Sequence, residues 1–244
     1  MISNQYKGAF LGLAALAGLG AVLVERNAAS AEGTPAPAGH HLKVVELFQS
    51  QGCSDCPPAE TNVNALANSP DVLALSYGVT YWDQLGWKDT FATPQFTKRQ
   101  WEYANRRGRG QVWTPQVFVN GKADLVGSNR GQLDRAIATS TVAGPGVAIQ
   151  AERATVAAGA APAKPATVWL VRYDPRTLDV PIRAGENGGR TLPHRNIVRE
   201  LTRLGTWNGQ AASFALPAAS HPGLSKAVLV QDGPGGAIVG AAKG

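Results

Sequence analysis

The stretch VELFQSQGCSDCPPAE, residues 45–60, contains the only two cysteines of the 244-residue chain, Cys53 and Cys56. They follow an apolar run, Leu42–Phe48, in which only two residues are charged. A short apolar run bounded by turn residues is typical of a strand buried on both faces. The cysteines are therefore expected directly after a buried strand.

The residues after the cysteines predict a helix and then a second buried strand. Pro57 and Pro58 fit the first turn of a helix, where the missing backbone N–H groups are no loss. We expect this helix to end near Ala67, before Ser69–Pro70, and a strand to follow at Val72–Val79. The order is then strand, CxxC turn, helix, strand.

The next segment interrupts this order with a helical, tryptophan-rich insertion at Tyr81–Trp113. After it, Asn120–Gly121 is a strong hairpin signal. We expect a helix at Pro94–Ala104, strands at Gln116–Val119 and Ala123–Val126, and a helix at Asn129–Thr139. These elements predict a mixed α/β layer at 42–143.

The sequence after Gly144–Pro145–Gly146 has a different character, and residues 145–244 are expected to form a β-rich C-terminal domain or an extension packed on the first part. The segment His194–Leu204 is compatible with either a helix or a strand. Strands are expected at Val147–Val156, Thr167–Tyr173, Val180–Arg183 and Lys226–Gln231.

The N-terminus resembles an export signal. Lys7 precedes an uncharged apolar run, Ala9–Val24, and Ala29–Ser30–Ala31 fits a signal-peptidase site. We expect a signal peptide at 1–31, a flexible linker at 32–41 and a periplasmic or secreted location. An uncleaved membrane anchor is the alternative, and the membrane is expected to be contacted only through this segment. Disulfides persist in such compartments.

The charge pattern gives no sign of a nucleic-acid partner. The formal net charge is +6, but the basic residues are scattered, and only Arg106, Arg107 and Arg109 cluster. A solvated loop explains this cluster more simply than a nucleic-acid surface.

Three interpretations of the CxxC pair compete. A zinc site needs four ligands, and the chain has no second pair and no suitably spaced histidines, so no metal is expected. A structural disulfide is a second interpretation, although a bridge across two residues closes a very short loop and stabilises little through loop entropy. The third is a redox pair.

The redox interpretation has a physical mechanism. The N-terminus of a helix presents unpaired N–H groups and the positive end of the helix dipole, and both stabilise a thiolate. Cys53, just before the helix, is expected to be the exposed attacking sulfur, and Cys56 the more buried resolving sulfur. The partners would be protein or small-molecule thiols and disulfides, with a redox partner protein and no cofactor.

The order of strand, CxxC turn, helix and strand, followed by Trp113–Thr114–Pro115 before a hairpin, resembles the thioredoxin fold. The strings VVELFQSQGCSDCPPAE (44–60) and GENGGRTLPHRNIVRELTRLGTW (185–207) more closely resemble a family of exported bacterial proteins that have a thioredoxin-like fold and no assigned function. The resemblance implies that Thr114 and Pro115 form a cis-proline loop that holds the substrate backbone, with Trp113 near the sulfurs.

Two features depart from redox-active thioredoxins. Ser54–Asp55 stands between the cysteines, and an aspartate there opposes the helix dipole, which predicts a weak oxidant or a reductant. Glu46 matches the buried carboxylate of the thioredoxin strand only with a spacing one residue longer. It is either a general base or the partner of an arginine from the second domain.

Other groups leave alternatives open. The polar set Glu186, Asn187, Arg190, His194 and Asn196 forms either a brace between the two halves, which we expect, or a second ligand site. The alternative function is a binding protein whose cysteines form a structural disulfide or hold Cu(I). Copper is disfavoured because Met1 is the only methionine.

Overall fold

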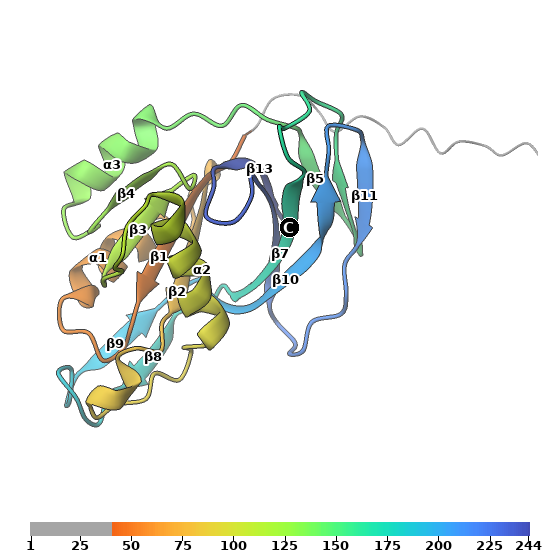
Figure 1. The fold of residues 1–244 in the computed structure, drawn as a ribbon. Coiled ribbons are helices and arrows are strands. Elements are labelled where there is room, and N and C mark those ends of the chain that lie inside the picture. The colour runs from red at the N-terminus through yellow and green to blue at the C-terminus, as the bar shows by residue number, and fades with distance from the viewer. Residues whose placement is uncertain (1–40) are drawn as a thin grey trace, which may run out of the picture. The chain divides into compact units, whose positions relative to one another are not determined.

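The main sheet takes strands from both halves of the sequence (Figure 1). The computed structural model describes residues 41–244, which belong to one compact unit. The expected signal peptide and nearly all of the linker lie outside the described residues. The strands of the main sheet are β1 (Lys43–Gln49), β2 (Val72–Gly78), β3 (Gln116–Val119), β4 (Ala123–Leu125), β7 (Ala166–Asp174), β10 (Ile197–Trp207), β12 (Ser225–Gln231) and β13 (Ile238–Lys243).

These strands lie in the order β13-β12-β7-β10-β2-β1-β3-β4. β1 runs parallel to β2 over its whole length and antiparallel to β3. β10 touches β2 through a single parallel register pair, Ile197 and Ser76, and pairs with β7 along most of its length. The segments 42–143 and 145–244 therefore share one sheet, joined at the β2–β10 edge.

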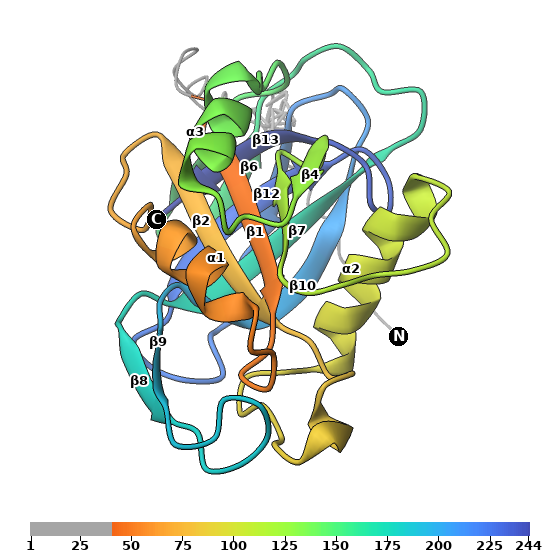
Figure 2. The same cartoon turned by 90° about the vertical axis from the view of Figure 1, so that its left-hand side faces the viewer.

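Helices cover both faces of the β2-β1-β3-β4 part of the sheet. They are α1 (Cys56–Asn64), α2 (Pro94–Arg106) and α3 (Arg130–Thr139), with a short 3-10 turn, η1, at Asp83–Leu85. Alternate residues of a strand point to opposite faces. Leu47 of β1 packs with Ala59 of α1 and Leu133 of α3, whereas Phe48 packs with Phe96 of α2. Figure 2 shows α1 and α3 on the near side of β1 and β2.

The C-terminal part adds two smaller sheets. Strands β5 (Val147–Gln150), β6 (Arg153–Val156) and β11 (Ala212–Ala215) form a three-stranded sheet that packs on β7 and β12 through a third apolar core. Strands β8 (Leu178–Pro181) and β9 (Thr191–His194) form an antiparallel hairpin. This hairpin carries the polar segment that includes Glu186 and Asn187.

Several element predictions need correction. The predicted strand at Val147–Val156 is a hairpin of two strands, because the chain turns at Ala151, which has a φ of +48°. Helix α1 ends at Asn64 rather than near Ala67. The segment left as helix or strand is the strand β10. The short strand β11 and the C-terminal strand β13 were not expected.

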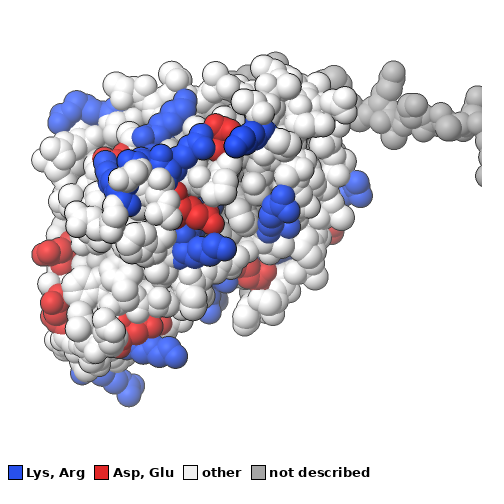
Figure 3. All heavy atoms as spheres, in the orientation of Figure 1, with Lys and Arg blue, Asp and Glu red and all other residues white. Residues whose placement is uncertain are grey.

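The basic cluster is paired with acidic side chains. Arg109 forms an ion pair with Asp124, and Arg106 lies 3.5 Å from a carboxylate oxygen of Asp232. Figure 3 shows blue and red side chains interleaved over this face of the molecule.

No helix within residues 41–244 is long and apolar enough to cross a membrane.

Candidate functional site

The two cysteines form a disulfide where β1 passes into α1. The loop after β1 turns through a hydrogen bond from Cys53 N to Ser50 O, and Cys56 is the first residue of α1. The Cα atoms of Cys53 and Cys56 are 5.5 Å apart. The sulfurs therefore lie at a helix N-terminus, as the proline pair predicts.

The prediction that Cys53 is the exposed sulfur is wrong. Cys53 and Cys56 are both only 1% exposed, whereas Ser54 and Asp55 between them are exposed. The loop between β8 and β9 lies against the backbone of the CxxC loop. The Nδ2 group of Asn187 donates hydrogen bonds of 2.9 Å to the carbonyl oxygens of both Gln51 and Cys53.

The polar segment is a brace between the two halves, as expected. Four of its five residues reach the N-terminal half, and the fifth, Arg190, donates to Asn187 Oδ1. The contacts to the N-terminal half are those of Glu186 with Ser54, Asn187 with Gln51 and Cys53, His194 with Glu60, and Asn196 with the carbonyl of Ala74.

The tryptophan-rich segment holds the other side of the CxxC loop. Trp87 Nε1 donates to the side-chain oxygen of Gln51 at 2.9 Å, and Gln51 N donates to Asp89 Oδ2 at 2.8 Å. A Cβ on Gly52 would lie 3.4 Å from Cβ of Trp82, so the loop and Trp82 pack closely. Two of the tryptophans thus border the CxxC loop.

Thr114 is connected to the CxxC loop through Trp82, whose Nε1 donates to Thr114 Oγ1 at 2.7 Å. The Thr114–Pro115 peptide bond is cis. Trp113 is half-buried, and the guanidinium of Arg109 lies over its ring, with Cζ 5.4 Å from the ring centroid. Thr114 therefore contacts Trp82, which packs on the CxxC loop, whereas Trp113 contacts Arg109.

Of the two alternatives for Glu46, the structure shows a pair with a buried arginine, but this arginine comes from α2 and not from the C-terminal half. Arg99 Nε donates to Glu46 Oε1 at 2.8 Å, and the hydroxyl of Tyr103 also donates to this carboxylate. The C-terminal half contributes Gln231, whose Oε1 accepts from Arg99 at 3.1 Å. Glu46 alternates with Leu47 and so faces α2, on the side of the sheet opposite α1.

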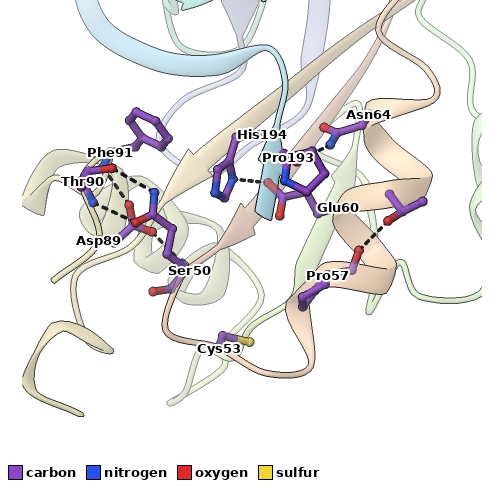
Figure 4. Close-up of polar contacts among 12 residues, drawn as sticks. Ser50, Cys53, Pro57, Glu60, Asn64, Asp89, Thr90, Phe91, Pro193 and His194 are labelled. Atoms are coloured by element: carbon purple, nitrogen blue, oxygen red, sulfur yellow. Dashed lines mark hydrogen bonds and ion pairs between the residues drawn. The ribbon is translucent and has the colours of Figure 1, made fainter. Parts of the chain in front are cut away.

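Sequence reasoning missed a buried carboxylate on the cysteine side of the sheet. Glu60 lies four residues after Cys56 on the buried face of α1 and is bonded to Nδ1 of His194 from β9 (Figure 4). Burial raises the pKa of Glu60, although the contact with His194 acts in the opposite direction. The spacing of one helical turn from Cys56 is the signal that could have identified it.

His194 lies between two carboxylates. Figure 4 shows its ring with Glu60 on one side and Asp89 and Phe91 on the other. Burial also raises the pKa of Asp89, while hydrogen bonds from the backbone N–H groups of Gln51 and Phe91 lower it in part. Within the described part of the chain, Nε2 of His194 has no hydrogen-bond partner.

The described residues include no group of three or more His, Cys, Asp or Glu side chains arranged to hold a metal ion. The chemistry that the arrangement offers is that of a dithiol and disulfide at a helix N-terminus, with a buried carboxylate and imidazole one helical turn away.

Comparisons with known proteins place the chain in a family. Residues 44–231 match the model of the DUF1223 family, described as a protein of unknown function. A structural-genomics target protein from Agrobacterium tumefaciens is similar, with 30% identity, a TM-score of 0.70, and coverage of 84% of this chain and 95% of that one. HBP35 of Porphyromonas gingivalis shares the fold at 12% identity, with a TM-score of 0.52 and coverage of 84% and 75%. No curated protein matches the sequence. The chain belongs to the DUF1223 family of proteins of unknown function.

Proposed function

We propose that this protein is an exported, thioredoxin-like thiol–disulfide oxidoreductase that works through Cys53 and Cys56. The observation that carries the proposal is the bond between these cysteines at the first turn of α1. A helix N-terminus stabilises a thiolate, so a dithiol there is a better nucleophile and leaving group than an ordinary pair of cysteines.

The surrounding fold supports the thioredoxin-like interpretation. The β2-β1-β3-β4 order, with α1 and α3 on one face and α2 on the other, is compatible with that fold. In the proposal, Thr114 and Pro115 hold the backbone of the substrate, and Trp113 borders its binding surface. Partners would be proteins or small molecules that carry thiols or disulfides.

The proposed reaction exchanges two electrons. The Cys53 thiolate attacks one sulfur of a substrate disulfide, forms a bond to it, and releases the other sulfur as a thiolate that takes up a proton. Cys56 then loses its proton and attacks Cys53 Sγ. The bond from Cys53 to the substrate breaks, the second substrate thiolate leaves and is protonated, and the protein is left oxidised.

Glu60 replaces Glu46 as the group proposed to accept the proton of Cys56. Glu46 faces α2 and is paired with Arg99, whereas Glu60 shares the buried face of α1 with Cys56. Burial raises the pKa of Glu60, and a carboxylate with a raised pKa binds a proton more readily than an ordinary one.

The test is the reduction potential of the pair, measured by thiol trapping in dithiothreitol and glutathione buffers. A value between roughly −270 and −120 mV supports the proposal, because dithiol oxidoreductases lie in this range. A Cys56→Ala protein should then accumulate mixed disulfides through Cys53, whereas the matched Cys53→Ala protein should not.

A binding protein with a structural disulfide is the second candidate, and the burial of both cysteines is the observation that favours it. It predicts a potential below about −300 mV together with loss of the fold on reduction. Either result would contradict the oxidoreductase proposal.

A further inference from the structure

The loop between β8 and β9 supplies side chains that bond to the CxxC loop: Glu186 contacts Ser54, and Asn187 contacts Gln51 and Cys53. In Figure 2 this loop lies beside the one that connects β1 to α1. Its first and last parts turn at Gly185 and Gly189, which have φ angles of +75° and +84°. Hydrogen bonds from Gly188 N to Gly185 O and from Gly189 N to Ile182 O give the loop a defined internal structure.

Asn187 is the only buried residue among 183–191. Its Nδ2 group donates to two carbonyl oxygens of the CxxC loop, and its Oδ1 accepts from Arg190 at 2.7 Å. An amide whose donors and acceptor are all engaged fixes the backbone that it contacts. One of these carbonyl groups belongs to Cys53, which is only 1% exposed, so the same side chain anchors the backbone of this buried cysteine.

Glu186, the neighbour of Asn187, brings a negative charge to the same loop. Its Oε2 accepts from Ser54 N at 3.1 Å and from Ser54 Oγ at 2.7 Å. These hydrogen bonds lower the pKa of Glu186, so it stays ionised near neutral pH. The carboxylate is held on Ser54, the residue after Cys53, just before α1, where a thiolate would benefit from the helix dipole.

We propose that Glu186 and Asn187 are positioning residues of the dithiol site: Asn187 limits access to the disulfide, and the Glu186 carboxylate disfavours the Cys53 thiolate and so makes the pair more reducing. The inference deepens the proposed function and rests on it for its biological meaning. A negative charge beside the sulfur destabilises the thiolate, which disfavours the reduced form relative to the disulfide.

Glu186→Gln tests the charge, since it preserves the shape and an acceptor oxygen. The thiolate fraction of the reduced protein, followed by ultraviolet absorbance, should rise at a fixed pH. The equilibrium with dithiothreitol should shift about two- to fivefold toward the reduced protein. Asp55, Glu60, Asp89 and His194, the other titratable groups around the site, remain unchanged in this variant. Unchanged thiolate fraction and equilibrium would overturn the role of the charge.

Asn187→Ala tests the cover, with Thr191→Ala on the same hairpin as the matched control. The rate of disulfide reduction by a water-soluble phosphine should increase about tenfold or more for Asn187→Ala and stay unchanged for Thr191→Ala. Faster amide exchange should be confined to residues 51–56, and the far-ultraviolet spectrum should be that of the wild type. Equal reduction rates in the two variants would overturn the role of Asn187.

These readouts separate the two proposals. Mixed disulfides in the Cys56→Ala protein, together with no effect of either hairpin substitution, would remove the inference and leave the oxidoreductase standing. Faster reduction of Asn187→Ala, together with a reduction potential below the oxidoreductase range, would support the role of Asn187 in limiting access to the disulfide. It would also contradict the proposed oxidoreductase function.

Discussion

His194 and Glu60 form a buried hydrogen bond although they lie 134 positions apart in the sequence. The pair connects β9 to α1, and therefore connects the hairpin that contacts the CxxC loop to the helix that begins with Cys56. A second carboxylate, Asp89, interacts electrostatically with the same imidazole. The charge state of this cluster thus affects both the fold and the surroundings of the cysteines.

Glu60→Gln should change how stability depends on pH. Burial raises the pKa of Glu60 above its ordinary value of 4.5, so the folded protein keeps a proton that the unfolded chain has lost. The free energy of unfolding of the wild type should therefore fall as the pH rises from 4.5 through the raised pKa. The variant should lack this part of the fall.

Urea unfolding of the oxidised protein, from about pH 4 to about pH 7, measures this effect. Asp89→Asn should remove a further part of the fall, because burial raises the pKa of Asp89 in the same direction. Asp134→Asn, on the exposed face of α3, is the control and should follow the wild type. Parallel curves for Glu60→Gln and the wild type would contradict the prediction.

Arg99→Met should destabilise the protein strongly, because it leaves Glu46 buried without its cationic partner. Removal of one member of a buried pair costs roughly 3–5 kcal/mol. The double variant Glu46→Gln/Arg99→Met should recover part of this loss. Arg130→Met, which breaks the exposed Arg130–Asp134 pair, should cost less than about 1 kcal/mol.

A single substitution of Glu46 distinguishes a structural role of this residue from a redox role. Because Glu46 faces α2, Glu46→Gln should leave the reduction potential of Cys53–Cys56 unchanged within error. A clear change in the potential, with the fold intact, would restore Glu46 as a candidate general base.

The sequence predicts those parts of the fold that depend on local signals. The apolar run before Cys53 and the prolines after Cys56 place β1 and the start of α1, and Asn120–Gly121 places the β3–β4 turn. The turn at Ala151 was missed because alanine with a positive φ has no local signal. In that case the pairing of β5 with β6 fixes the backbone, and residue preference does not.

The candidate site was predicted only in part, because local signals place some of its residues and tertiary contacts place the others. The position of the cysteines follows from the order of elements near them. The burial of Cys53 does not, because it depends on tertiary packing: Asn187, which bonds to the Cys53 carbonyl, lies 134 residues away in the sequence. Glu60 was overlooked because a glutamate in a short helix is usually solvent-exposed, and only the arrival of His194 makes its burial tolerable.

Gly121→Ala should destabilise the β3–β4 turn beyond the cost of its backbone conformation. Gly121 has a φ of +62°, and an added Cβ would lie 2.4 Å from the carbonyl oxygen of Gly236. Gly108 is the matched control, with a φ of +65° and open space around its Cβ position. Gly108→Ala should cost about 1 kcal/mol and Gly121→Ala clearly more, measured by urea unfolding. Equal losses would show that the contact with Gly236 is easily relaxed.

Cys53→Ala/Cys56→Ala should leave the protein folded with a modest loss of stability. The bridge joins residues three positions apart, and closing so short a loop removes little entropy from the unfolded chain. The expected loss in the free energy of unfolding is roughly 2 kcal/mol, measured by urea unfolding under oxidising conditions. The wild type under dithiothreitol should show a similar loss, because reduction removes the same constraint while keeping both side chains. A loss above about 5 kcal/mol in both cases would mark the bridge as structural and count against a pair that must open and close in each turnover.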